Sequence, residues 1–347
     1  MSAPDLDCRP RIAVDTSPLA DPRGSLARWM EPALEALTAH GGVECVPFES
    51  SRTRCPRVRL LRGAQRRLVQ SCQGLHSFTS GFPLRIPDRV PLVQTVHELP
   101  WRHGVAEGSG PLHRGWVAAG RRRAIAVVCP TEHVRGDLLA ARRGRSTGPP
   151  IRVLSWGLDP AFRRPSPTGR PADRALLLPL ADRPKKRALC AVRALPHLPS
   201  DLQLQLTGHR RQAPSELLSA ARDLGVADRV EWLGRVDGSA LPDRFARAAG
   251  VLCLAASEGF CLPVAEALAS GVPPIYPRAG AQAEVAGGHG YACDDPTDPR
   301  ALAGAIERAL TWSAADADAA RAFSVRYAWS AWAEGAVRLW RELVADR

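Results

Sequence analysis

The chain has 347 residues, of which 45% are hydrophobic and 24% charged, a globular composition long enough for two domains with their own cores. No stretch approaches the roughly 20 apolar residues of a membrane-spanning helix, and the first residues lack the apolar core of a secretory signal, so we expect a cytoplasmic protein. The net charge of +12 fits nucleic acid, an anionic membrane, an anionic substrate or simply a solvated basic surface, but no nucleic-acid-binding motif supports the first of these.

Short apolar runs alternate with longer helical patterns in the first half of the chain, which predicts parallel sheet crossed by helices. The expected strands are residues 11–14, 43–48, 92–96, 124–128 and 151–154. We expect one helix after Gly24, through Trp29 and Leu34. A second should follow Thr131, a favourable N-cap, and run through Leu138.

The basic stretch at residues 52–70 allows two interpretations. As a helix it would align Val58, Leu61, Ala64 and Leu68 on an apolar face among arginines, a pattern that suits an anionic membrane surface. The alternative is an ordinary helix with solvated arginines.

Residues 159–173 contain four prolines with Ser, Thr and Gly, which predicts a linker between two domains. The βα alternation then restarts. Strands are expected at residues 175–178, 202–206, 230–233 and 251–255, with one helix carrying Leu217, Ala221 and Leu224 on a buried face and a tryptophan-rich helix from Tyr327 through Trp340.

The predicted fold is therefore α/β, with two doubly wound, Rossmann-like domains facing each other across a cleft. We assign residues 1–163 to the first domain and residues 164–326 to the second. The last segment, residues 327–347, is expected to pack back on the first domain.

The most informative segment is residues 251–271, VLCLAASEGFCLPVAEALASG. An apolar strand is followed by a glycine-bearing loop and by a helix that starts near Pro263 and ends at Gly271. The N-terminus of such a helix attracts phosphate. Glu258 lies on the loop, free to accept hydrogen bonds from a polyhydroxyl ligand, and Glu266 lies one turn into the helix. Taken alone, the spacing of the two glutamates is explained as well by chance or by complementing the helix dipole as by a role in binding.

The wider sequence resembles glycosyltransferase family 4. The segment EGFCLPVAEALASGVP is similar to the family pattern E-G-F-G-L-P-x-x-E-A-x-A-x-G-x-P, and the segments LQLQLTGH, ARDLGVADRVEWLG and GVPPIYPRAGAQAEV also match. The matching is good over residues 200–311 and looser elsewhere. The resemblance implies the two-domain GT-B fold and sugar transfer from a nucleotide sugar with retention of configuration.

The resemblance also implies roles for residues of the second half. Glu258 would bind hydroxyls of the donor sugar, and Glu266 the ribose. The backbone amides that would approach the sugar and the phosphates belong to Gly259, Phe260, Cys261 and Leu262. Cys261 stands where the family usually has glycine, so a positive φ there would cost energy.

Lys186 matches the family lysine that neutralises the diphosphate, and Arg183 is a candidate for the same task. The Gly-Arg pair that precedes the lysine in the family is replaced by Leu180-Ala181. A solvated basic start to a helix is the alternative for residues 185–187.

In the first half, the run TVHELPW resembles the family's strand that ends in T-x-H-D, with His97 and Glu98 in the last two places. This implies that His97 lies near the sugar, although a histidine after a strand is often structural. Gly24 matches a family glycine that lets the backbone approach a substrate closely.

By resemblance, then, the chain is a retaining hexosyltransferase of the EC 2.4 class with a nucleotide sugar and a hydroxyl acceptor as substrates. Catalytic roles are expected for Glu258, His97 and Lys186, with no cofactor and no metal ion, since no CxxC pair or His/Cys ligand cluster is visible. The alternative is a weakly active or inactive scaffold that binds a nucleotide sugar or a glycan. Peripheral contact with the inner face of the cell membrane stays open, whereas a dinucleotide-binding oxidoreductase is disfavoured because no G-x-G-x-x-G follows the first strand.

Overall fold

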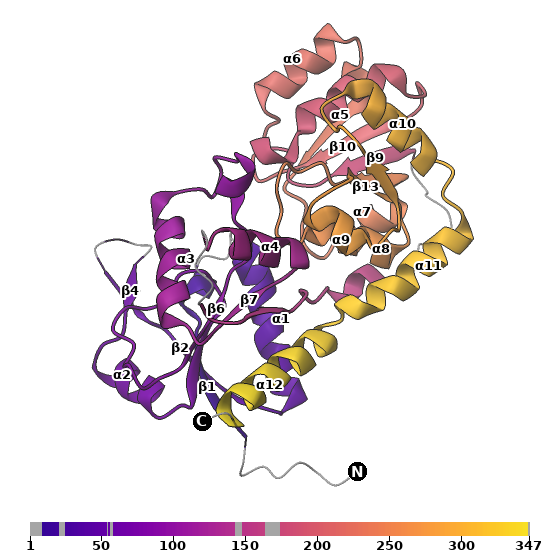
Figure 1. The fold of residues 1–347 in the computed structure, drawn as a ribbon. Helices are drawn as coiled ribbons and strands as arrows, with labels where there is room; N and C mark the ends of the chain where they lie inside the picture. Colours follow the sequence, from indigo (N-terminus) through magenta and orange to yellow (C-terminus); the bar gives the residue numbers. More distant parts are fainter. Residues whose placement is uncertain are drawn as a thin grey trace. The chain divides into compact units, whose positions relative to one another are not determined.

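The protein is described by a computed structural model that covers residues 9–20, 25–53, 55, 58–142, 148–163 and 174–345. The chain forms two compact units, shown in Figure 1. Unit 1 comprises residues 1–157 and 327–347, and unit 2 comprises residues 158–326. The second unit thus begins one residue before the proline-rich stretch, of which residues 164–173 lie outside the described residues.

Unit 1 contains a parallel sheet in the order β2-β1-β5-β6-β7-β8. Its strands are β1 (Arg11–Asp15), β2 (Glu44–Phe48), β5 (Gly74–Ser77), β6 (Leu92–Thr95), β7 (Ala126–Cys129) and β8 (Ile151–Val153). Five of them were expected from the sequence. The sixth, β5, was not predicted although it lies in the middle of the sheet.

Helices cover both faces of this sheet because successive strand residues alternate between two cores. On one face Ile12 and Val14 pack with α1 (Ser25–His40) and α12 (Trp329–Ala345). On the other face Ala13 packs with a separate cluster. The helices of that second face are α2 (Gly63–Gln70), α3 (Pro111–Arg123) and α4 (Glu132–Ala140). Thr131 caps α4 as predicted, since its hydroxyl accepts from the Val134 N–H at 3.2 Å.

The chain returns to unit 1 after unit 2, and α12 packs along α1 (Figure 1). Trp340 is fully buried and lies directly over Gly74 of β5, where an added Cβ would meet the indole at 2.4 Å. The Trp340 Nε1–H also donates to His76 Nδ1 at 3.3 Å. A glycine in the central strand therefore leaves room for the largest side chain of the final helix.

The described part of residues 52–70 does not form one helix, so the apolar face that a single helix would have aligned is absent from it. The described part of this stretch contains β3 (Ser51–Arg52), which pairs antiparallel with β4 (Arg59–Leu60), and then α2. Leu61 is buried in the unit 1 core, whereas Ala64 is exposed. The apolar positions are divided between the end of the hairpin and α2, so they do not share one helical face.

Unit 2 contains a second parallel sheet in the order β11-β10-β9-β12-β13-β14. Its strands are β9 (Ala175–Leu178), β10 (Gln203–Thr207), β11 (Val230–Gly234), β12 (Gly250–Leu252), β13 (Pro274–Pro277) and β14 (Tyr291–Cys293). The first four were expected; β13 and β14 were not.

Two groups of helices flank this sheet (Figure 1). One group is α5 (Ala188–Ala194), α6 (Ser215–Asp223) and α10 (Pro299–Ala309), and the other is α7 (Leu241–Arg247), α8 (Leu262–Ser270), α9 (Ala281–Ala286) and α11 (Ala314–Ser324). Leu217 and Ala221 of α6 are buried as predicted, but Leu224 is 40% exposed. The prediction for Leu224 was wrong because α6 ends one residue earlier, at Asp223.

Short 3-10 helices connect several of these elements. They are η2 (Ser17–Ala20), η3 (Pro100–His103), η4 (Pro160–Arg163), η5 (Pro184–Lys186), η6 (Leu195–His197), η7 (Ala227–Arg229) and η8 (Val325–Tyr327). Among the described helices, none combines the length and the apolar character that crossing a membrane requires.

Candidate functional site

The strand order of unit 2 has one reversal point, between β9 and β12. The chain winds outward from β9 through β10 to β11, then returns to the other side of β9 and continues through β12, β13 and β14. In open parallel sheets, ligands bind outside the carboxyl ends of the strands at such a point. The loops that follow β9 and β12 are therefore where a ligand of this unit is expected.

These two loops are bonded to each other. The backbone N–H of Ala256, in the loop after β12, donates to the carbonyl of Lys185 in η5 at 2.8 Å. The tight turn of η5 places Lys185 and Lys186 next to the loop that carries Glu258.

A buried charge pair joins the loops. Lys186 Nζ lies 2.8 Å from Glu258 Oε1, and Lys185 Nζ lies 3.8 Å from the same oxygen. The side chains of the two lysines are 9% and 5% exposed and that of the glutamate 14%. A solvated role for the lysines is thus wrong. Glu258 is also not free, since it already accepts from Lys186.

The pair keeps both partners ionised. Burial alone would raise the pKa of Glu258, but the positive charges of Lys186, Lys185 and Arg183 outweigh burial and hold its pKa below the usual range. Burial would lower the pKa of Lys186, but the charge of Glu258 raises it above the ordinary value of lysine. Two cations beside one carboxylate leave an excess of positive charge at this sheet edge, which favours an anionic ligand.

Helix α8 begins at the same place. Its first residues, Leu262 and Pro263, follow directly on the loop that carries Glu258, so the positive end of the helix dipole adds to the charge of the lysines. Cys261 precedes the helix with φ of 70°. The conformation is the left-handed one expected for a position usually held by glycine, so Cys261 costs energy there.

Glu266 points from α8 into the interior and is 4% exposed. Burial and the neighbouring Cys261, with a smaller contribution from the charge of Glu266, raise the pKa of the Cys253 thiol, while Lys186 opposes the shift. Cys253 directly follows β12. Cys253 was not singled out from the sequence because it lies in an uninterrupted apolar run.

The replaced Gly-Arg pair has a visible structural effect. Leu180 has φ of 57°, again a conformation that favours glycine. Its N–H donates to Thr207 Oγ1 at 3.2 Å and the Ala181 N–H donates to the Thr207 carbonyl at 2.7 Å. The backbone therefore keeps the turn that glycine would favour, while the arginine charge of the family pattern is absent and Arg183 supplies charge nearby.

In unit 1, His97 follows β6 and lies among aromatic rings. It stacks edge-on against Trp29 and Trp156, with ring centroids 5.3 and 5.0 Å away. Burial lowers the pKa of His97 to about 4, against the opposing effect of its bond to Phe78. In the neutral ring, Nε2–H donates to the Phe78 carbonyl at 2.7 Å, which leaves Nδ1 as an acceptor. This buried Nδ1 finds no partner among the described residues.

The structure thus brings Lys186, Glu258, Arg183 and Cys261 together at one sheet edge of unit 2, whereas His97 belongs to unit 1. Gly24 lies outside the described residues. Lys185 was missed as a site residue, although the doubled lysine after Pro184 was a signal for it.

Comparisons with known sequences find glycosyltransferases. Residues 178–311 match the family described as "Glycosyl transferases group 1". Over 306 residues the chain is 29% identical to a D-inositol 3-phosphate glycosyltransferase of Acidothermus cellulolyticus, covering 78% of this chain and 67% of that protein. Over 143 residues it is 34% identical to an MMP alpha-(1->4)-mannosyltransferase of Mycolicibacterium hassiacum, covering 40% of this chain and 34% of that protein. Its homologues are therefore glycosyltransferases.

Solved structures resemble the whole chain. The sucrose-phosphate synthase of Thermosynechococcus elongatus matches with a TM-score of 0.75 and 21% identity over 98% of this chain and 100% of that one. HepE of Anabaena, solved with UDP and glucose, matches with a TM-score of 0.72 and 18% identity over 96% and 100%. The fold is GT-B. Units 1 and 2 thus correspond to the two domains of the GT-B fold.

Proposed function

We propose that this protein is a family 4 glycosyltransferase that moves a sugar from a nucleotide sugar to an acceptor hydroxyl with retention of configuration. The observation that carries the proposal is the buried group of Lys185, Lys186 and Glu258 at the reversal point of the unit 2 sheet, beside the N-terminus of α8. The cations would suit the diphosphate of a nucleotide sugar, and the two carboxylates of this region would suit its sugar and ribose hydroxyls.

In this proposal the residues of unit 2 act through charge and position. The bond between the sugar anomeric carbon and the diphosphate oxygen breaks, a bond to the acceptor oxygen forms on the same face, and a phosphate oxygen takes the acceptor proton. Lys186, supported by Arg183, stabilises the negative charge on the departing diphosphate. Glu258 orients Lys186 and accepts hydrogen bonds from the sugar, while Glu266 accepts from the ribose hydroxyls.

The acceptor nitrogen of His97 is proposed to receive a substrate hydroxyl. Its neutral ring and unpartnered Nδ1 are suited to a hydroxyl and not to an anion. We propose that the reaction needs no cofactor and no metal ion, so turnover should persist in excess EDTA.

The first experiment is a binding screen by calorimetry with nucleoside diphosphates and nucleotide sugars. UDP-glucose comes first, because the similar HepE of Anabaena has been solved in complex with UDP-glucose. Glu266→Ala should weaken binding about 10- to 100-fold through loss of hydrogen bonds to a charged acceptor. Glu307→Ala, an exposed glutamate on α10 of the same unit, is the matched control and should bind normally.

The second candidate is a scaffold that binds a nucleotide sugar without transferring it, and the replacement of the Gly-Arg pair by Leu180-Ala181 favours it. Release of nucleoside diphosphate, with a product whose anomeric configuration matches the donor by NMR, would exclude the scaffold. Tight, Glu266-dependent binding with no turnover over a broad acceptor panel would instead favour it. An inverted product would overturn retention.

A further inference from the structure

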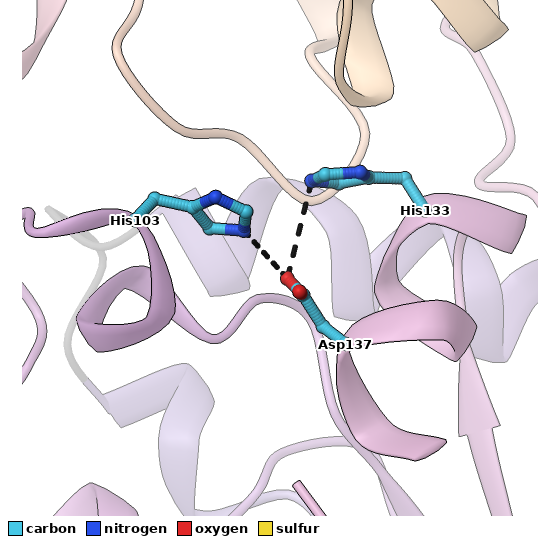
Figure 2. A group of neighbouring side chains, drawn as sticks. All are labelled: His103, His133 and Asp137. Atoms are coloured by element: carbon cyan, nitrogen blue, oxygen red, sulfur yellow. Dashed lines mark hydrogen bonds and ion pairs between the residues drawn. The ribbon is translucent and has the colours of Figure 1, made fainter. Parts of the chain in front are cut away.

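Three potential metal ligands converge on the surface of unit 1 (Figure 2). His103 is the last residue of η3, whereas His133 and Asp137 are one turn apart on α4 and therefore share a face of that helix. A search of the described part of the chain for three or more His, Cys, Asp or Glu side chains that could hold one ion finds this group. The sequence alone did not reveal it, because His103 is thirty positions from His133.

The distances suit a single ion. Asp137 Oδ2 lies 2.6 Å from His103 Nε2 and 3.9 Å from His133 Nε2, and all three ligand atoms lie within 4.8 Å of one another. Ligand atoms around a tetrahedral zinc ion with bonds of ~2.0–2.2 Å are separated by about 3.3–3.6 Å. Binding an ion would thus lengthen the 2.6 Å separation and shorten the 3.9 Å separation by less than about 1 Å each. The rings already face each other at a tilt of 31° with centroids 5.1 Å apart.

The carboxylate of Asp137 is held in a way that leaves one oxygen for the ion. Arg102 Nε donates to Oδ1 at 3.0 Å, while Oδ2 faces the two histidines (Figure 2). Such outer partners orient the ligands of metal sites in proteins. The charge of Arg102 also opposes a cation, so the affinity should be moderate.

The side chains of His103 and His133 are 29% and 27% exposed, and that of Asp137 is 11% exposed. The site is therefore open to solvent, and water can complete the coordination. Two imidazoles and one carboxylate suit Zn²⁺, Co²⁺ and similar transition metals, whereas Mg²⁺ and Ca²⁺ prefer oxygen ligands.

We propose that His103, His133 and Asp137 bind a divalent transition metal ion of the Zn²⁺ class. The ion would replace the proton between His103 and Asp137 and would tie η3 to α4. Because η3 starts three residues after His97, the ion would also restrain the segment that follows this histidine. The proposal does not depend on the proposed sugar transfer, because the ligands lie outside the unit 2 site.

The test uses Co²⁺ as a spectroscopic probe on the full chain, purified without a histidine tag and kept reduced with a phosphine. The protein should develop visible ligand-field bands when titrated with Co²⁺, and Zn²⁺ should displace them. His133→Ala and His103→Ala should each remove the bands and weaken Zn²⁺ binding, measured against a chromophoric chelator, by at least about 10-fold.

His113→Ala is the matched control. His113 lies in the same unit and is bonded to the Gly108 carbonyl and to Ser80 Oγ, outside the cluster. Circular dichroism and the metal-free Tm of each variant show whether the fold is kept. Because His103 and His133 come from different elements, a shared loss of binding cannot come from local unfolding of one of them.

Absence of ligand-field bands in the wild-type protein would overturn the proposal. Bands that survive in either His103→Ala or His133→Ala would do the same, as would bands carried by a thiolate charge-transfer signal, which would assign the metal to cysteine. Loss of the bands in both variants, with bands retained in His113→Ala, would support the site.

Discussion

The two sheets have closely related topologies, but the carboxyl ends at their reversal points carry opposite kinds of polar groups. In unit 2 that edge holds full charges in a buried pair, Lys186 with Glu258. In unit 1 the reversal lies between β1 and β5, and Asp15 at the end of β1 accepts from the N–H and hydroxyl groups of Ser17 and Ser50. The Arg59 guanidinium donates to the carbonyls of the same two serines. One edge thus holds a direct ion pair, whereas at the other the carboxylate and the guanidinium both bond to serine groups.

The histidines of unit 1 extend this contrast. Burial lowers the pKa of His76 to about 3, and His97 likewise stays neutral. One architecture can therefore bury an ion pair at one sheet and neutral histidines at the other. A few loop residues after the strands determine which polar groups each sheet edge carries.

The largest expected effect comes from removing the charge of unit 2. Lys186→Met should lower the rate of sugar transfer by about 10²–10³-fold, because a donor to the developing charge is lost. It should also destabilise the fold by about 3–5 kcal/mol, because Glu258 keeps a buried charge without its main partner. Steady-state kinetics and urea unfolding measure the two effects separately.

The double variant Lys186→Met/Glu258→Gln serves as its control. It should recover part of the stability because the buried carboxylate charge is removed, although Lys185 also loses this carboxylate, and activity should stay low. Recovery of activity together with stability would mean that Lys186 has only a structural role.

The next effect concerns the neutral histidines of unit 1. In the unfolded chain His76 takes up a proton near the ordinary imidazole pKa of 6.5, whereas in the folded protein burial lowers this pKa to about 3. Stability is therefore fully present above pH 6.5 and is lost as the pH falls below it. At pH 4 the loss should be on the order of 3 kcal/mol from this residue. His76→Gln should flatten the dependence of the unfolding free energy on pH between 4 and 6.5; an unchanged slope would show that His76 is not kept neutral.

A third effect tests the packing of unit 1. Gly74→Ala places a Cβ against the indole of Trp340 and should destabilise the fold by about 1–3 kcal/mol through overpacking. Gly115→Ala on α3, where an added Cβ meets nothing within 4 Å, should instead be neutral or stabilise by up to about 1 kcal/mol. Equal Tm values for the two variants would contradict the close approach of α12 to β5.

The smallest effect tests backbone strain in unit 2. Because Cys261 has φ of 70°, Cys261→Gly should be more stable than Cys261→Ala by about 1 kcal/mol. In a helix or strand interior the order would be reversed. Thermal unfolding of the two variants measures the difference, and a more stable alanine variant would argue against the left-handed conformation.

The sequence predicted the elements whose patterns are local. Strand β9 was predicted with its observed bounds because it is a run of four apolar residues. The start of α8 was predicted to within one residue because proline is typical of the first turn of a helix and glycine of the position after its end. Strand β5 has the sequence GLHS, with glycine and histidine in place of β-branched residues, and β14 has only three residues. Such strands form because their neighbours in the sheet select them.

In the site, too, the sequence predicted local motifs but not contacts between residues far apart in the chain. The motif around Glu258 and Glu266 indicated a donor site, but the pairing of Glu258 with Lys186 joins residues 72 positions apart. No spacing rule reveals such a bond. The positive φ of Leu180 was equally hidden, because leucine gives no sign of a left-handed conformation.

The return of α12 to unit 1 has a consequence for synthesis on the ribosome. Domains usually fold in the order in which they emerge, the N-terminal one first. Here the core of unit 1 includes Trp332, Val337 and Trp340, which are translated after all of unit 2. Unit 2 can therefore complete its own core while the larger part of unit 1, already synthesised, still waits for its closing helix. During that interval the apolar face of α1 and β1 is open, and nascent chains of this protein should be clients of chaperones until the last helix is released.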